Sequence, residues 1–177
     1  VWEELPPLLG PRGSPAAAAV QGAVYVCGGY DSQFQPRSGC ERLQPTRRGR
    51  RRSGGGRLAW EAVREMAEGR AGAAAAAIAR RLLVCGGRSA GRSLQSAECF
   101  DPEVEVWESM PSMLMCRAHA AYAVTGGRLY IFGGRGGSSD SGCRLNSCEV
   151  FDPQRSEWTV LPLMAERRTD AAAAAAW

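Results

Sequence analysis

The stretch RLYIFGGRGG, residues 128–137, runs from apolar strand formers directly into a pair of glycines. The same arrangement occurs twice earlier, as AVYVCGGYD at 23–31 and RLLVCGGRS at 81–89. A pattern that recurs at a spacing of 47 to 58 residues predicts a repeated structural unit. Because glycine adopts positive φ and admits close backbone approach, each pair is expected to end a strand where a neighbouring unit crowds it.

Two further residue types keep a fixed distance from the first glycine of each pair. A tryptophan stands 26 residues before it and an arginine stands 16 residues before it in all three copies. These residues are Trp2, Trp60 and Trp107, and Arg12, Arg70 and Arg117. A fourth copy begins at Trp158, and Arg168 follows it at the same offset. The fixed offsets predict a single structural register for the whole chain.

Each copy contains four apolar runs of strand length. In the third copy they are Ala120–Val124, Leu129–Phe132, Cys148–Phe151 and Trp158–Leu161. Turn residues bound these runs, and none has the length of a typical helix. Four short strands at this spacing are typical of a β-propeller blade, in which antiparallel four-stranded sheets pack around an axis. We expect the second strand of each blade, which ends in the glycine pair, to lie near that axis.

The sequence therefore predicts an all-β fold with about three four-stranded blades of an incomplete propeller. The blades are expected at residues 12–64, 70–110 and 117–161, with a strand of a preceding blade at 1–5 and the start of a following blade at 168–177. Propellers close with about four to eight blades, so we expect the chain to be a piece of a larger ring.

Two alanine runs fall in register with Ala120–Val124. They occupy residues 73–77 and 171–176. Alanine alone favours helix, but the register predicts that both runs are first strands of their blades. The runs are too short and too weakly apolar to span a membrane, and we expect no signal peptide.

The positive charge of the chain is concentrated in one loop insertion. The formal net charge is +4, every basic residue is arginine, and six arginines lie in the Arg/Gly-rich segment 46–57. The rest of the chain is close to neutral, which does not favour a nucleic-acid platform. The run 47–52 is either a nuclear-localisation or RNA-contacting patch or simply a solvated loop. As a connection between third and fourth strands, it is expected on the face opposite the longer loops.

The cysteines and the one histidine do not form a metal or catalytic motif. The seven cysteines include no Cys-x-x-Cys, and His119 is the only histidine. Cys27 and Cys85 precede glycine pairs, where a small buried side chain suits the strand. We therefore expect reduced thiols, a cytoplasmic location with a nuclear one open through the arginine run, no metal site and no cofactor.

The run LNSCEVFDPQRSEWTVLPLMAERR at 145–168 resembles the kelch repeat, most closely that of BTB-kelch proteins, which are adaptors of cullin-type ubiquitin ligases. The features that carry the resemblance are the glycine pairs, the Glu-x-Phe-Asp-Pro run, the tryptophan and the repeat arginine; the glycines and tryptophans are Gly28, Gly29, Gly86, Gly87, Gly133 and Gly134, with Trp60, Trp107 and Trp158. The first copy departs from the pattern, because it reads RLQP at 42–45 where the later copies read Phe-Asp-Pro.

The resemblance implies a non-catalytic module that captures a protein partner, with further kelch repeats and BTB or BACK domains outside this chain. An actin-binding or other cytoskeletal scaffold is the alternative. An enzyme resembling the copper oxidases or isomerases of this fold is less favoured, because a single histidine cannot supply the two that the oxidase site needs.

The resemblance also implies which residues surround a partner pocket. They are the residue after each glycine pair (Tyr30, Arg88, Arg135), the repeat arginine (Arg12, Arg70, Arg117) and the position two beyond it (Ser14, Gly72, His119). Strand alternation places the second-to-third and fourth-to-first loops, which carry these residues, on one face. Arginine pairs well with carboxylates and phosphates, so an acidic or phosphorylated protein segment is the expected partner. The repeat arginines have a second interpretation, in which they tie neighbouring loops together.

Overall fold

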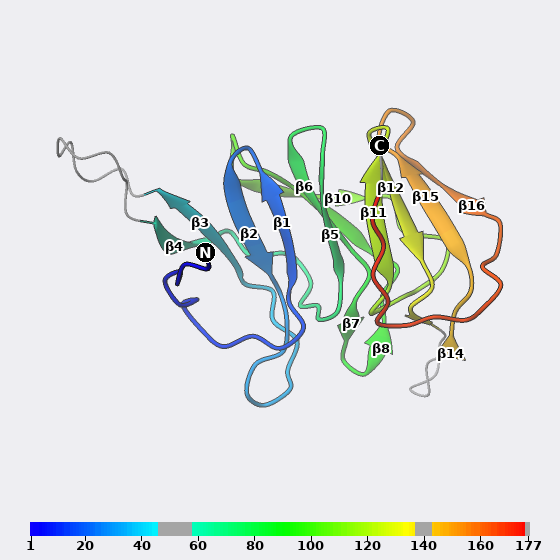
Figure 1. The fold of residues 1–177 in the computed structure, drawn as a ribbon, viewed down its shortest axis with the longest axis horizontal. Coiled ribbons are helices and arrows are strands. Elements are labelled where there is room, and N and C mark those ends of the chain that lie inside the picture. Colours follow the sequence, from blue (N-terminus) through cyan, green and yellow to red (C-terminus); the bar gives the residue numbers. More distant parts are fainter. Residues whose placement is uncertain (46–57, 137–142, 176–177) are drawn as a thin grey trace.

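The computed structural model describes residues 1–45, 58–136 and 143–175, and within them every regular element is a β-strand (Figure 1). The first blade contains β1 (Ala16–Val20), β2 (Ala23–Cys27), β3 (Cys40–Pro45) and β4 (Leu58–Val63). The second contains β5 (Ala74–Ile78), β6 (Arg81–Cys85), β9 (Ala97–Asp101) and β10 (Val106–Met110). The third contains β11 (Ala121–Thr125), β12 (Arg128–Phe132), β15 (Cys148–Asp152) and β16 (Glu157–Leu161).

Each blade is an antiparallel sheet whose strands pair in chain order, so the all-β prediction with three four-stranded blades is confirmed. Two short hairpins follow the glycine pairs of the second and third blades. They are β7 (Arg88–Ser89) with β8 (Arg92–Ser93), and β13 (Arg135–Gly136) with β14 (Cys143–Arg144). The predicted insertion 46–57 and its arginine run lie outside the described residues.

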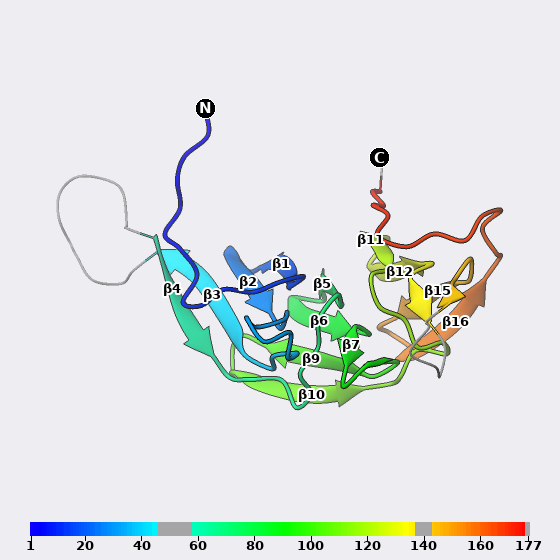
Figure 2. The same ribbon diagram turned by 90° about the horizontal axis from the view of Figure 1, so that it is seen from below.

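The three blades form an open arc (Figure 2). The first strands β1, β5 and β11 line its inner side, and β5 contacts both of the others. The second strands β2, β6 and β12, which were expected near the axis, each pair directly with one of these inner strands. The alanine run at 73–77 is confirmed as strand β5 over all but its first residue. Small side chains let the inner strands approach one another, so tertiary packing overrides the helix preference of alanine.

The two expected flanking strands do not form. Residues 1–5 and 171–175 have no strand pairing, and Trp2 is fully exposed. A strand requires a hydrogen-bonding neighbour, and the described chain offers neither segment one. Residues before the first blade nevertheless follow the repeat. Pro6 stands four residues after Trp2, and its carbonyl accepts the indole N–H of Trp60 at 2.9 Å. Trp107 and Trp158 make the equivalent bonds to Arg64 and Pro111 at 2.7 and 2.9 Å.

The core consists of apolar layers between successive blades. Tyr25 of the first blade meets Phe100 of the second with ring centroids 5.9 Å apart. Between the second and third blades, Leu83 and Phe151 belong to one buried cluster. All seven cysteines are free thiols, and burial raises the pKa of Cys85 to about 12. No described segment forms a helix long and apolar enough to cross a lipid bilayer.

The glycine pairs end the second strands against the backbone of the next blade. Gly86 and Gly87 have φ of +65° and +95°, and the Gly87 amide donates to the carbonyl of Arg117 at 2.9 Å. A Cβ atom at Gly86 would overlap that same carbonyl oxygen. The first pair meets Arg70 and the third meets Arg168 in the same way. Glycine is therefore required at these positions for both reasons expected from the sequence, positive φ and close backbone approach.

We expect Gly86→Ala to destabilise the protein far more than Gly127→Ala. Both glycines have positive φ, but Gly127 has no atom within 4 Å of its would-be Cβ, so the control isolates backbone strain. Strain alone costs about 1–3 kcal/mol. The Gly86 variant must also push the next blade away, and a valine there should unfold or aggregate the protein. Urea denaturation measures the difference, and equal losses in the two alanine variants would show that the contact between blades does not matter.

Candidate functional site

The repeat arginines lie in the interior of their own blades. The Arg117 side chain is 1% exposed. It donates to the carbonyls of Gly133 and Ser147 at 2.7 and 3.1 Å and to the carboxylate of Glu149 at 2.5 Å. Arg70 bonds Gly86, Ser96 and Glu98 in the same manner, and Arg12 bonds Gly28, Gly39 and Glu41.

The glutamate of each pair also holds the loop that precedes its arginine. The Glu149 carboxylate accepts the backbone amides of Leu114 and Met115 at 2.7 and 3.0 Å. In the same way, the Glu98 carboxylate accepts the backbone amide of Ala67, and the Glu41 carboxylate accepts that of Leu9. The sequence marked each glutamate as the start of the E-x-x-x-P run of its third strand, but it did not predict that this glutamate pairs with the repeat arginine. The arrangement supports the second interpretation of the repeat arginines, because their guanidinium groups tie loops together and are buried away from any partner.

Arg168 begins the fourth copy and differs from the other repeat arginines. Its carbonyl accepts the Gly134 amide at 2.8 Å, as the register requires. Its side chain is 58% exposed and pairs with Glu166 at 3.2 Å.

The positions two beyond the repeat arginines form a backbone chain from blade to blade. The Gly72 amide donates to Ser14 at 2.9 Å, the His119 amide donates to Gly72 at 2.8 Å, and the Asp170 amide donates to His119 at 3.0 Å. All four residues have positive φ. His119 Nδ1 also lies 3.2 Å from Asp170 Oδ1. The structure therefore brings Ser14, Gly72 and His119 together, and Asp170 continues the chain. Asp170 could have been predicted, because it stands two residues after Arg168, the repeat arginine of the fourth copy.

The residues that follow the first two glycine pairs meet at a pocket between the first and second blades. The pocket has a volume of about 490 Å³. One wall is formed by Tyr30, Phe34, Gln35 and Pro36, and the other by the turn Arg88–Gly91. Tyr30 and Arg88 were expected here from the resemblance. Phe34 was missed because nothing in the repeat marks a residue inside a loop that only the first blade has.

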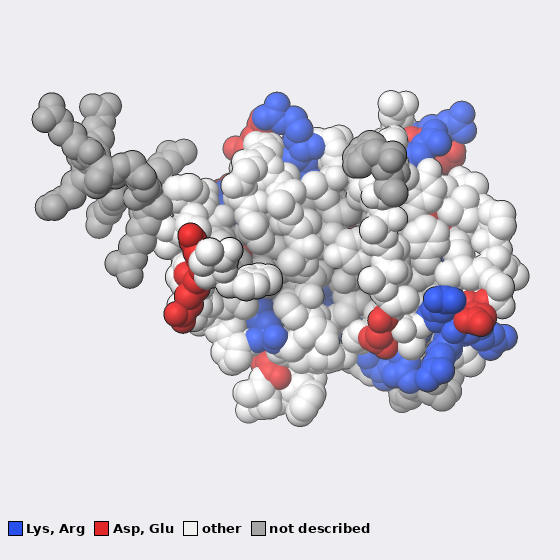
Figure 3. Space-filling view, in the orientation of Figure 1, with Lys and Arg blue, Asp and Glu red and all other residues white. Residues whose placement is uncertain are grey.

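The short hairpins gather further arginines beside this pocket. In β7 and β8, Ser89 pairs with Arg92, and in β13 and β14, Arg135 pairs with Arg144. The Ser93 hydroxyl donates to the Arg135 carbonyl at 3.0 Å and so joins the two hairpins. Arginines collect over β7, β8 and β14 in Figure 3. We call Arg88, Arg92, Arg135 and Arg144 the arginine patch. Arg92 and Arg144 lie on the return strands of the hairpins, which the repeat register did not predict.

Arginines on the opposite face have carboxylate partners. Arg80 pairs with Glu103, Arg81 with Asp101 and Glu108, and Arg128 with Asp152, at distances of 2.8 to 3.3 Å. Among the described residues, no carboxylate forms an ion pair with Arg92, Arg135 or Arg144. Arg92, Arg135 and Arg144 therefore differ in charge compensation from the arginines of the opposite face, and they lie on the face with the longer loops.

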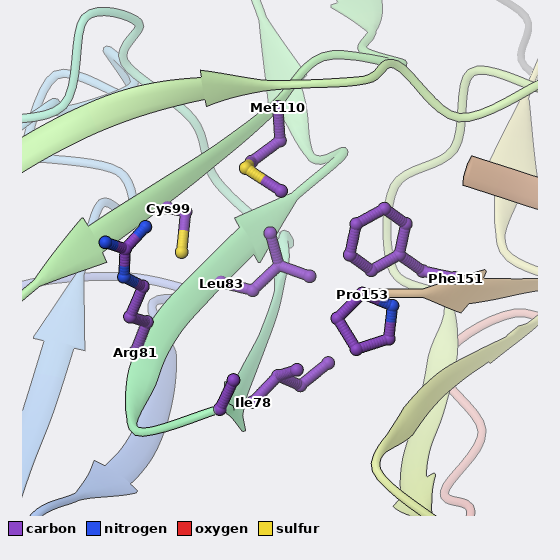
Figure 4. Close-up of a pocket in the computed structure, with 8 residues that line it drawn as sticks. Ile78, Arg81, Leu83, Cys99, Met110, Phe151 and Pro153 are labelled. Atoms are coloured by element: carbon purple, nitrogen blue, oxygen red, sulfur yellow. The ribbon is translucent and has the colours of Figure 1, made fainter. Parts of the chain in front are cut away.

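A second cavity lies between the second and third blades, away from the arginine patch (Figure 4). It has a volume of about 220 Å³ and is lined mainly by apolar side chains, including Leu83, Met110 and Phe151. The first blade has the larger Tyr25 where the second has Leu83, and Tyr25 is buried against Phe100. The cavity is therefore a consequence of a smaller side chain in the second blade.

The described side chains do not form a metal centre. Within residues 1–45, 58–136 and 143–175, no three His, Cys, Asp or Glu side chains come together in a way that could hold a metal ion. The His119 imidazole contacts the Asp170 carboxylate at 3.2 Å.

Comparison with known proteins gave one family and a set of similar folds. The family model described as the KLHDC2/KLHL20/DRC7 Kelch-repeats domain matches residues 7–176. No curated protein matched the chain. A solved structure titled "Structure of YjhT" aligns with a TM-score of 0.72 at 18% identity, over 91% of this chain and 54% of that one. The chain thus spans about half the length of that protein, and the likeness concerns the fold alone.

We expect Glu149→Ala to destabilise the protein by about 3–5 kcal/mol, because it leaves the Arg117 guanidinium buried without its counter-charge. Glu157→Ala is the matched control, since Glu157 is 53% exposed and pairs with the exposed Arg155. Its loss should cost less than about 1 kcal/mol. Denaturant titration gives both free energies of unfolding. Similar values for the two variants would contradict a structural role for the buried pair.

Leu83→Phe should stabilise the protein by about 0.5–2 kcal/mol by filling the cavity between the second and third blades. The larger ring restores part of the volume that Tyr25 supplies in the first blade. Thermal melting reports the change, and Leu82→Phe serves as the control because Leu82 is fully buried and does not line this cavity. A lower melting temperature for Leu83→Phe would mean that the cavity walls cannot accommodate the ring.

Proposed function

The chain belongs to the KLHDC2/KLHL20/DRC7 Kelch-repeats domain family, and on this premise we propose that it is a non-catalytic module that binds a protein partner through the face carrying the arginine patch. Propeller faces bind through the loops that connect their strands, and this face carries the longer ones. The partner that fits is an acidic or phosphorylated segment. A substrate-recognition role in a cullin-type ubiquitin ligase adaptor is the form of this function that the resemblance at 145–168 favours.

The difference in charge compensation between the hairpin arginines and the arginines of the opposite face carries the proposal. An arginine that already has a carboxylate partner has little to gain from a second one, whereas an exposed arginine without one can pair with a ligand. Arg92, Arg135 and Arg144 are exposed, and Ser93 and the strand pairing hold their hairpins side by side. Hydrogen bonds between arginine and carboxylate or phosphate contribute about 1.5–3 kcal/mol each.

The interior role of Arg12, Arg70 and Arg117 sharpens the proposal. These residues supply no surface charge, so the partner is recognised by the arginines of the hairpins rather than by the repeat arginines. Ser14 and His119 lie beside the axis on the inner rim, where their backbone bonds join the blades. They are proposed to border the binding surface and to contribute less than the arginine patch.

Charge reversal on the two faces should have different effects on binding. A peptide array on the complete protein is expected to select Asp-, Glu- or phosphate-bearing segments, and Arg135→Glu should weaken a selected peptide about tenfold. The paired Arg80 on the opposite face is the control, and Arg80→Glu should leave the affinity within about twofold. Binding by the wild type should weaken with added salt. Selected peptides without acidic bias, or equal effects of the two reversals, would contradict the proposal.

A further inference from the structure

One loop of the first blade presents an aromatic ring to solvent beside the arginine patch. Phe34 is 80% exposed, and its ring centroid lies 6.5 Å from that of Tyr30. The second and third blades have short hairpins where the first has this loop. The feature is therefore not a part of the repeat and is not needed to build a blade.

Hydrogen bonds within the loop hold it in a conformation that disfavours its own aromatic residue. The Asp31 carboxylate accepts the amides of Gln33 and Gln35 at 2.8 and 2.9 Å, and the Phe34 amide donates to the Asp31 carbonyl at 3.1 Å. Phe34 itself has φ of +57°, which bulky residues rarely adopt. Exposure of the ring and positive φ both count against phenylalanine for stability. Strain of this kind concentrates at binding sites, where presenting the side chain is what matters.

The pocket beside Phe34 has walls of different chemistry. Tyr30, Phe34 and Pro36 form one wall, and the Arg88–Gly91 turn forms the other. A ring inserted between them would pack against the aromatic side chains and lie beside the guanidinium of Arg88. The turn Arg88–Gly91 also leads directly into Arg92, so the pocket and the arginine patch are parts of one surface.

Resting on the proposed function, we infer that the partner segment is bipartite: an aromatic side chain occupies the pocket formed by Tyr30, Phe34 and the Arg88–Gly91 turn, and acidic residues beside it contact Arg92, Arg135 and Arg144. The aromatic residue supplies a buried anchor of the kind that dominates protein interfaces. The acidic residues supply the counter-charge that Arg92, Arg135 and Arg144 do not receive from any described carboxylate. Charge complementarity thus selects the segment, and the pocket fixes its register on the face.

Phe34→Asn separates binding from folding. Asparagine tolerates left-handed φ, so this variant should keep the loop and melt at or above the wild-type temperature. The ligands are two sets of Glu-rich peptides, one with a single Phe placed at successive positions and a matched set with Ala. We expect at least one Phe peptide to bind the wild type about tenfold more tightly than its Ala counterpart. Phe34→Asn should abolish that preference, and Phe34→Tyr should retain it.

The salt dependence distinguishes failure of this inference from failure of the proposed function. Phe34→Asn should weaken the Phe peptide without changing the salt dependence of its affinity, whereas Arg135→Glu should reduce that dependence. If the wild type binds Phe and Ala peptides equally while Arg135→Glu still weakens both, the bipartite ligand is wrong and the acidic partner stands. If neither the Glu-rich peptides nor the reversal has an effect, both proposals are wrong.

Discussion

The contact between a glycine pair and the next repeat arginine is the constraint on which the rest of this structure depends. Gly87 donates its amide to the Arg117 carbonyl, and the backbone there lies too close for any Cβ at Gly86. The side chain of the same arginine turns the other way, into its own blade, where Glu149 neutralises it. One residue therefore connects two blades, through its carbonyl to the preceding one and through its guanidinium to its own.

This arrangement determines where the chain is free to vary. The glycine pair, the arginine and the glutamate are fixed by backbone contacts and buried charge, so they recur in each copy. The segment that leaves the glycine pair emerges at the edge of one face, and there the copies differ. The first carries a loop with an exposed phenylalanine, and the second and third carry arginine-bearing hairpins. The arginine patch and Phe34, to which we assign partner binding as a proposal, therefore lie in the segments that vary between copies.

Much of the fold could be predicted from the sequence because the signals were periodic. The offsets of tryptophan, arginine and glycine gave the register, and the alanine run at 73–77 could be assigned to a strand by that register against its own propensity. The order of strands from the axis could not be predicted, since spacing along the chain does not reveal which edge of a sheet faces inward. The sequence also did not reveal which side chains point into the blade and which point to solvent. Arg117 and Arg135 both occupy repeat positions, yet only burial shows that one is structural and the other exposed. Phe34 could not be predicted because it lies in a loop that is not part of the repeat.

Chemical-shift mapping by NMR tests most directly which face of the protein binds its partner. A Glu-rich peptide containing one Phe would be titrated into isotope-labelled protein, and the backbone amides would be followed. The account predicts shifts at Tyr30–Gln35, along the Arg88–Ser93 hairpin and at Arg135 and Arg144, with none at Arg80, Arg81 or Arg128. Shifts confined to those last three arginines, or spread evenly over both faces, would contradict it.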